Sequence, residues 1–130
     1  MIAFVEGNES PYLESEKAMF EALANLDPEL DQAYRDHLET YDGEVLPYLL
    51  MTDMTNTLLN MLSEEPTKTA IVREGFAIIE AQWNTGESCD LIALQFVDAV
   101  NDPGDPWYPL VRAQLSPAMV ALFDHELGRR

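Results

Sequence analysis

The chain has 130 residues, 47% of them apolar, and a formal net charge of −17 at neutral pH. That length fits one domain with a hydrophobic core, and the apolar content is typical of a globular protein rather than a disordered one. The charge argues against nucleic acid and anionic membrane surfaces as partners, because both would repel the protein. Residues 1–65 hold 15 acidic and 2 basic side chains, so most of the charge lies in the first half.

The sequence also indicates the cellular compartment in which the protein is expected. Residues 1–6 lack the basic start and the long apolar run of a signal peptide. The longest apolar-rich stretch, 45–62, is interrupted by Asp53, Asn56 and Asn60, which argues against a membrane span. Cys89 is the only cysteine, so no internal disulfide can form. We expect a cytoplasmic protein.

The first elements in the chain are an irregular segment and two helices. Residues 1–12 carry glycine, asparagine and proline and are expected to be irregular. A first helix is predicted from about Glu14 to Ala24. A second begins at Asp27-Pro28, where the aspartate caps the helix and the proline occupies its first position. It should end at Gly43, which suits a left-handed C-terminal residue.

Helical spacing divides the second helix into two faces. The apolar face contains Leu30, Ala33, Tyr34, Leu38 and Tyr41. The opposite, polar face contains Glu29, Gln32, Asp36 and Glu39.

A longer third helix is predicted from Pro47 to about Ser63. Its predicted core stripe consists of Leu50, Met51, Met54, Leu58, Met61 and Leu62. A second stripe is polar but almost uncharged and consists of Thr52, Asp53, Asn56 and Asn60.

The second half of the chain predicts further helices at 66–84, 88–100 and 107–115, and a last one from Ser116-Pro117. The helix over 88–100 is apolar on more than one side and should be central. Residues 101–106 form the strongest break. In the last helix the residues expected to point inward are Val120, Phe123 and Leu127.

Strand signals are nearly absent. We therefore predict an all-α protein: one helical domain over 1–130, with six to seven helices packed as antiparallel pairs. This could be a helical bundle or a short helical-repeat-like stack. No repeat with a fixed period is found.

Few residues suit catalysis or metal binding. The chain has two histidines and one cysteine, too few for a zinc motif, and none of its glycines are spaced for a phosphate loop. Asp36, His37 and Glu39 are interpreted as a solvated helix face rather than a cation site. Cys89 is interpreted as a small buried hydrophobe. We predict no catalytic, cofactor-binding or metal-binding residues, and no enzyme.

Three aromatic side chains, Trp83, Trp107 and Tyr108, lie near helix ends or breaks. They are interpreted as core rather than as the lining of a ligand pocket.

The carboxylates concentrated over 27–53 are the feature that folding explains least. Charge of this kind serves solubility, and it also forms interfaces for basic partners. The predicted partner-binding residues are Glu29, Asp36, Glu39, Asp42, Glu44 and Asp53.

The stretch Gly43–Met54 resembles a Gly-Glu-x-Leu-Pro-His-x-x-x-x-Asp pattern, and Leu91–Asp98 resembles a second block that ends in Phe, an apolar residue and an acid. Both belong to an uncharacterised family of small, acidic, helical bacterial proteins found at polymorphic-toxin loci. Tyr48 replaces the common histidine, and Asp98 replaces a glutamate. The resemblance implies an immunity role and transfers no catalytic residue.

The leading hypothesis is therefore an immunity-type protein that binds a cognate toxin, such as a nuclease, through its acidic surface. Two alternatives stay open. One is a ligand-binding or enzymatic protein with a pocket near Asp53, and the other is a homodimeric adaptor. The sequence leaves the oligomeric state undetermined.

Overall fold

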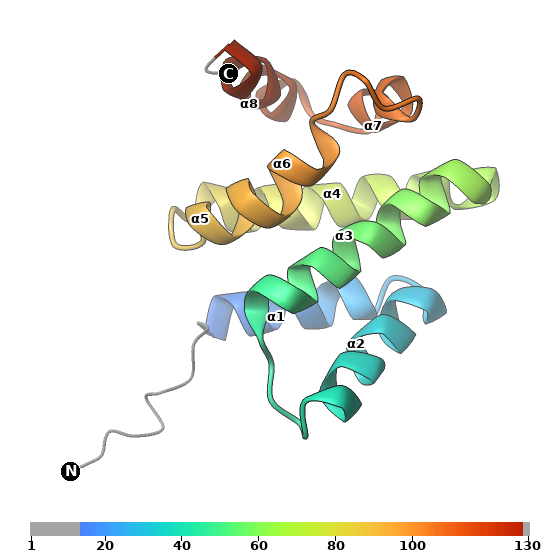
Figure 1. Ribbon diagram of the computed structural model, residues 1–130, viewed down its shortest axis with the longest axis vertical. Helices are drawn as coiled ribbons and strands as arrows, with labels where there is room; N and C mark the ends of the chain where they lie inside the picture. The colour runs from blue at the N-terminus through green and yellow to red at the C-terminus, as the bar shows by residue number, and fades with distance from the viewer. Residues whose placement is uncertain (1–13, 129–130) are drawn as a thin grey trace.

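The computed structural model describes residues 14–128, and within that range every regular element is a helix (Figure 1). The α-helices are α1 (Glu14–Ala24), α2 (Pro28–Thr40), α3 (Pro47–Glu64), α4 (Thr69–Asn84), α5 (Cys89–Ile92), α6 (Asp98–Val100), α7 (Tyr108–Ala113) and α8 (Pro117–Gly128). A 3-10 turn, η2 (Pro66–Lys68), precedes α4, and a π-helical turn, η3 (Ala93–Val97), joins α5 to α6. The predicted all-α class is confirmed, with seven helices in the described range if 89–100 counts as one. The irregular segment expected over 1–12 lies outside the described residues.

Local sequence signals explain the helix starts. The Asp27 carboxylate accepts a hydrogen bond from the backbone N–H of Glu29 at 3.0 Å, and Pro28 is the first residue of α2. This satisfies a backbone donor that has no partner within the helix. Helix α3 also begins with a proline, Pro47, but without a side-chain cap because Leu46 precedes it.

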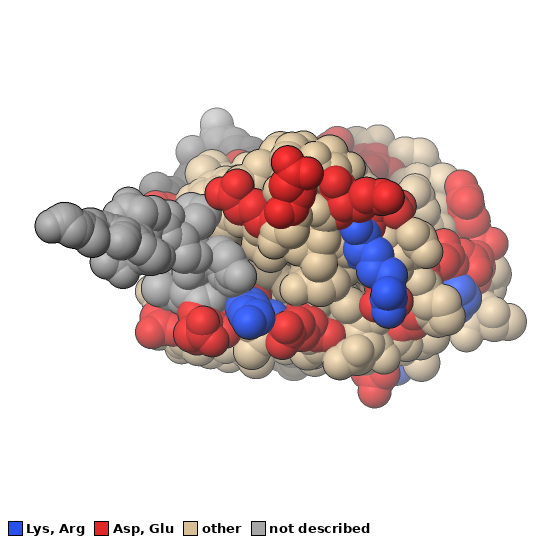
Figure 2. All heavy atoms as spheres, turned by 90° about the horizontal axis from the view of Figure 1, so that it is seen from below, with Lys and Arg blue, Asp and Glu red and all other residues tan. Residues whose placement is uncertain are grey.

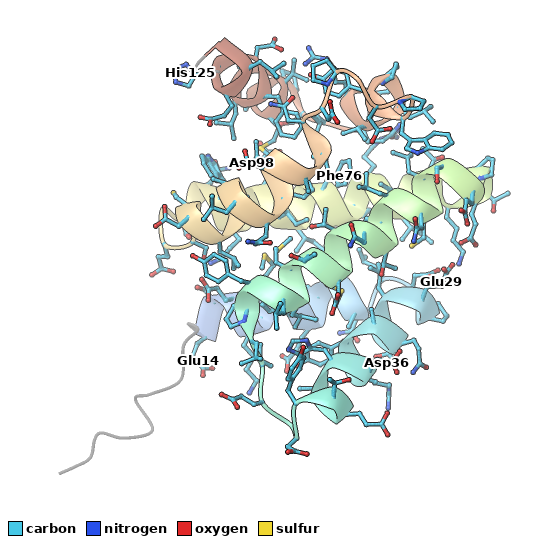
Figure 3. All side chains as sticks on the ribbon, viewed as in Figure 1. Glu14, Glu29, Asp36, Phe76, Asp98 and His125 are labelled. Atoms are coloured by element: carbon cyan, nitrogen blue, oxygen red, sulfur yellow. The ribbon has the colours of Figure 1, made fainter. Side chains whose placement is uncertain are left out.

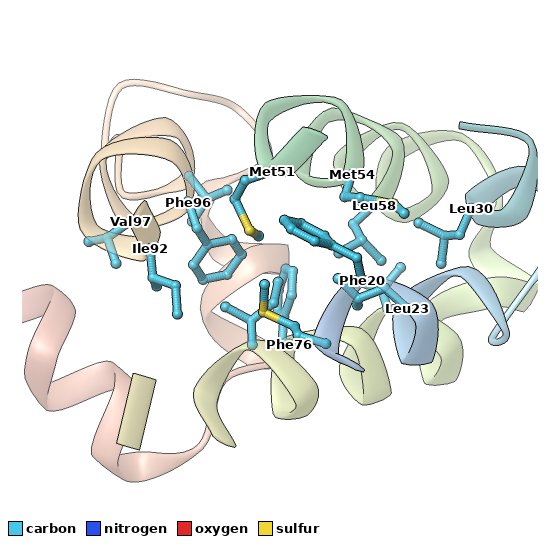
Figure 4. Packing of buried hydrophobic residues seen from close by; sticks show 14 of the residues in the cluster. Phe20, Leu23, Leu30, Met51, Met54, Leu58, Phe76, Ile92, Phe96 and Val97 are labelled. Atoms are coloured by element: carbon cyan, nitrogen blue, oxygen red, sulfur yellow. The ribbon is translucent and has the colours of Figure 1, made fainter. Parts of the chain in front are cut away.

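Helix α3 is the centre of the fold. It packs against α1, α2, α4, η3 and α7, and it crosses the middle of the molecule in Figure 1. Its whole predicted core stripe is buried. Figure 4 shows Met51, Met54 and Leu58 facing the core, where Phe20 and Leu23 of α1 meet them.

Three phenylalanine rings connect α4, η3 and α8. The ring centroids of Phe76 and Phe96 are 5.3 Å apart at an interplanar angle of 71°, and those of Phe96 and Phe123 are 6.3 Å apart at 61°. These are the edge-to-face arrangements that aromatic quadrupoles favour. Through these rings the hydrophobic core is continuous from α4, by way of η3, to the last helix, α8.

The helix over 89–100 is central, as expected, but it is not uniformly α-helical. The N–H of Asp98 donates to the carbonyl of Ala93, five residues back, which defines the π turn. Phe96 and Val97 are buried, whereas Leu94 is 54% exposed. The helix is therefore central, although Leu94 lies at its solvent-exposed side.

Asn101 fixes the C-terminal helices to this central helix. Its side chain is fully buried, donates from Nδ2 to the Phe123 carbonyl at 2.9 Å, and accepts from the Tyr108 hydroxyl at 3.0 Å. Phe123 is buried as predicted, while Val120 and Leu127 are only partly buried.

The prediction that Trp107 belongs to the core was wrong. This side chain is 43% exposed, because it follows the 101–106 break and precedes the first turn of α7 at the surface. Trp83, in contrast, packs partly buried against the core.

Candidate functional site

The six predicted partner-binding side chains, Glu29, Asp36, Glu39, Asp42, Glu44 and Asp53, are all exposed, and we call them the acidic surface. Figure 3 shows Glu29 near the start of α2 and Asp36 farther along that helix. Figure 2 looks onto the end of the molecule that contains α1, α2 and the turn after α2. It shows several groups of carboxylates with few basic side chains between them.

A left-handed turn positions two members of the acidic surface. Asp42 has a φ of 55° and Gly43 a φ of 85°, and the N–H of Gly43 donates to the Leu38 carbonyl at 2.7 Å. This six-to-one hydrogen bond closes the helix as a Schellman motif does. The predicted left-handed conformation of Gly43 is confirmed, and Asp42 before it is left-handed as well. The turn leaves Asp42 and Glu44 pointing into solvent.

His37 secures the same turn from inside. Its side chain has no exposed surface, its Nε2 accepts a hydrogen bond from the backbone N–H of Leu46 at 3.0 Å, and its ring packs on Tyr41 at 4.8 Å. The interpretation of His37 as part of a solvated face was therefore wrong. His37 lies on the buried side of α2, between the turn and α3.

Asp53 faces His37 from α3. Its Oδ2 lies 3.9 Å from Nδ1 of His37, too far for a hydrogen bond, and Nδ1 has no hydrogen-bond partner in the described structure. Burial lowers the pKa of His37, and the nearby Asp53 carboxylate opposes this shift. The imidazole is thus held in the neutral form near pH 7.

Asp36 and Asp53 line one shallow depression between α2 and α3. The depression has a volume of about 360 Å³ and is completed by Ala33, Asn56 and Thr57. One oxygen of Asp36 accepts from the Gln32 amide at 2.8 Å. Two carboxylates from different helices thus converge where the sequence had placed them on separate stripes.

Glu29 differs from the other five members. Its carboxylate contacts the Lys68 ammonium at 2.6 Å, and the same ammonium lies 3.2 Å from Asp27 and 3.2 Å from Glu65. Hydrogen bonding to Glu29 raises the pKa of Lys68, and hydrogen bonding to Lys68 lowers the pKa of Glu29. Glu29 is therefore part of an ion-pair network that ties α2 to η2.

Basic side chains neutralise little of the remaining surface. Arg35 is the only lysine or arginine in the sequence between 27 and 64, and its guanidinium pairs with Asp31 at 2.6 Å. Within residues 14–128, no lysine or arginine forms an ion pair with Asp36, Glu39, Asp42, Glu44 or Asp53.

A second hollow, of about 320 Å³, lies where α1, the start of α3 and the segment 86–91 meet. Glu16 is 6% exposed and accepts from the Ser88 hydroxyl at 2.5 Å, while the Gln82 amide donates to Ser88 at 2.8 Å and to Ser15 at 3.1 Å. These polar groups satisfy one another, so the network joins helices rather than presenting a reactive group. Sequence reasoning missed it, because each member looks like a surface residue.

Cys89 lines that hollow and is exposed, so its interpretation as a buried hydrophobe was wrong. No histidine lines the hollow beside it. Across residues 14–128, no three His, Cys, Asp or Glu side chains converge as metal ligands would. In the same range, no helix has both the length and the apolar character needed to cross a membrane.

Comparisons with protein-family models, with curated protein sequences and with solved structures found no match to this chain.

Proposed function

We propose that the chain is an immunity-type protein that binds and neutralises a cognate bacterial toxin, with its acidic surface against a basic site of the toxin. One observation carries the proposal. Five carboxylates around α2, the following turn and α3 are exposed and form no ion pair with a lysine or arginine of the described chain. Charge arranged in this way speeds association with a basic partner and rejects acidic ones.

The toxin context rests on the resemblance of Gly43–Met54 to proteins of toxin-immunity loci. The structure adds a physical argument for that stretch. Within it, Glu44 and Asp53 are exposed, whereas Pro47, Leu50 and Met51 are buried. The carboxylates are not needed to fill the core, so a role in partner binding is consistent with their positions.

The depression around Asp53 favours a side chain of a protein over a free small molecule. Small-molecule sites are mostly apolar and enclosed, but here Ala33 is the only apolar residue in the lining. Asp36, Asp53 and Asn56 instead offer oxygen acceptors at the rim. An arginine or lysine of the toxin would find two carboxylates there.

The first experiment is a growth assay. Any toxin gene found beside the gene for this chain is expressed in a sensitive host, with and without the chain. Rescue of growth by co-expression supports immunity. If that toxin arrests growth equally in both cases, the immunity proposal is overturned.

The second experiment tests the surface. Asp36→Asn, Glu39→Gln and Glu44→Gln are combined, and association with the purified toxin is followed at low and high salt. We expect the on-rate at low salt to fall by about 10-fold or more, with a smaller change at high salt. The matched control combines Glu64→Gln, Glu74→Gln and Asp90→Asn, which are exposed and lie outside the acidic surface.

Both variants lose three negative charges, so a purely global charge effect would slow them equally. An on-rate that falls only for the first variant places the toxin on the acidic surface. If both variants associate as fast as the wild type, the acidic surface is not part of the interface with the toxin.

A further inference from the structure

His37 is connected to three parts of the structure at once. It lies on α2, its Nε2 accepts from the Leu46 N–H at the start of α3, and its Nδ1 faces the Asp53 carboxylate. Between His37 and Leu46 runs the left-handed turn that carries Asp42 and Glu44. The hydrogen bond between the imidazole and the Leu46 N–H therefore holds the C-terminal end of this turn against α2.

The hydrogen bond to Leu46 fixes the protonation state of the ring. A backbone N–H can only donate, so Nε2 must be an unprotonated acceptor and the single ring hydrogen must lie on Nδ1. Adding a proton converts Nε2 into a donor. Two donors would then face each other, and the bond to Leu46 would be lost.

The surroundings give the protonated ring a competing partner. Asp53 of α3 is the charged group that faces the ring, at 3.9 Å, and Tyr41 of α2 is the titratable side chain that packs on it. The turn contributes a backbone N–H rather than a charge at this point. Protonation therefore weakens the contact with the turn and strengthens the attraction to α3.

We propose that His37 is a proton-operated clasp: the neutral imidazole holds the turn over 42–46 in place, and protonation releases this turn while the rest of the fold stays intact. The direction of the change is set by burial, which disfavours the charged ring inside the protein. Opening the turn lets water reach the charged ring and removes that cost.

The clasp is a property of the chain alone. Its consequence for binding rests on the proposed function. Release of the turn would displace Asp42 and Glu44, and the affinity for a basic toxin would therefore be lower at acidic pH. The two proposals can fail separately, because the clasp is tested without any toxin.

The experiment follows backbone amide exchange and the His37 ring resonances by NMR between pH 7.5 and 4.5, with exchange rates corrected for their intrinsic pH dependence. Near pH 7 the ring nitrogen shifts should report a neutral ring with its hydrogen on Nδ1. Below the ordinary histidine pKa of 6.5, the corrected opening constant of the Leu46 amide should rise by up to about tenfold per pH unit, because the open turn takes up one proton, and it should level off once the closed ring is protonated. Amides within α4 should keep their protection.

Three variants make the test specific. His37→Gln retains an oxygen that can accept from Leu46 but cannot titrate, so its turn should stay protected at all these pH values. Asp53→Asn removes the charge that favours the protonated ring, so the His37 ring should titrate at lower pH than in the wild type. His125→Gln is the control, because His125 is exposed on α8, far along the chain from the turn.

Several outcomes would overturn the clasp. One is a titration of His37 that leaves the Leu46 amide protected. Another is a turn that opens in His37→Gln at the same pH as in the wild type. A third is loss of protection in α4 together with the turn, which would mean global unfolding rather than a local release.

Discussion

Gly75 of α4 lies directly against Leu58 of α3: a Cβ built on Gly75 would lie 2.9 Å from Leu58 Cδ2. Leu58 is fully buried in the core, so its side chain could move away only by displacing its packed neighbours. Glycine costs a helix interior up to about 1 kcal/mol relative to alanine. The close packing of α3 against α4 offsets this cost, because a larger residue at position 75 would hold the two helices farther apart.

We therefore predict that Gly75→Ala lowers the free energy of unfolding by about 1 kcal/mol. Overpacking a core costs roughly 1–3 kcal/mol, which outweighs the gain in helix propensity of up to about 1 kcal/mol. Urea denaturation of wild type and variant measures the difference. In a Leu58→Ala background the same change should instead stabilise the protein. Stabilisation by Gly75→Ala in the wild-type background would refute the close contact.

His37 should make the free energy of unfolding depend on pH. Burial lowers the His37 pKa below its ordinary value of 6.5. The unfolded chain therefore binds the proton more readily than the folded chain, and stability is lost as pH falls below about 6.5. Above that pH both states are neutral at this position and the contribution is constant. Urea midpoints from pH 8 to 5 should decline less steeply for His37→Gln than for the wild type, and parallel slopes would contradict the prediction.

Lys68→Met should lower the melting temperature, because it leaves Asp27, Glu29 and Glu65 without their shared cation. The loss should be larger at low salt than at high salt, since screening weakens these partly exposed pairs. The raised pKa of Lys68 means that its stabilisation is complete below its ordinary pKa of 10.5 and is lost as pH rises beyond that value. Thermal melts at two salt concentrations measure the effect. Arg35→Met is the control, because it breaks only the exposed pair with Asp31.

Asn101→Ala should destabilise the protein by about 2–3 kcal/mol, because it removes the buried partner of both Tyr108 and the Phe123 carbonyl. Tyr108→Phe removes one of these bonds and should cost about 1 kcal/mol. Chemical denaturation with amide exchange in α8 separates local detachment from global loss. Full protection of α8 in Asn101→Ala would show that the side chain does not anchor that helix.

Much of the helical pattern could be predicted from sequence because its causes are local. The dipeptide Asp27-Pro28 contains both the cap and the first helical residue, and α1 ends at the predicted Ala24. The buried stripe of α3 follows from helical spacing alone. These features depend on neighbours within one or two turns, which a sequence displays directly.

The candidate site was harder to predict. His37 lies seven residues after the buried Leu30, so helical spacing does place it on the inner face, and only its polar nature suggested solvent. No such signal existed for the pairing of Glu16 with Ser88, which are 72 positions apart. The convergence of Asp36 and Asp53 likewise depends on how α2 packs on α3, which spacing within each helix does not encode.

The π turn over 93–97 has a consequence for how the length of this chain can vary. A π turn holds one residue more than an α-helical ladder needs. Removing the exposed Leu94 would let the segment from Cys89 to Val100 continue as a regular α-helix. Inside a regular α-helix such as α3, a one-residue deletion would instead rotate the buried stripe away from the core. Within this turn, the surplus residue gives the helix over 89–100 a place where the chain can shorten while the residues on either side keep their partners.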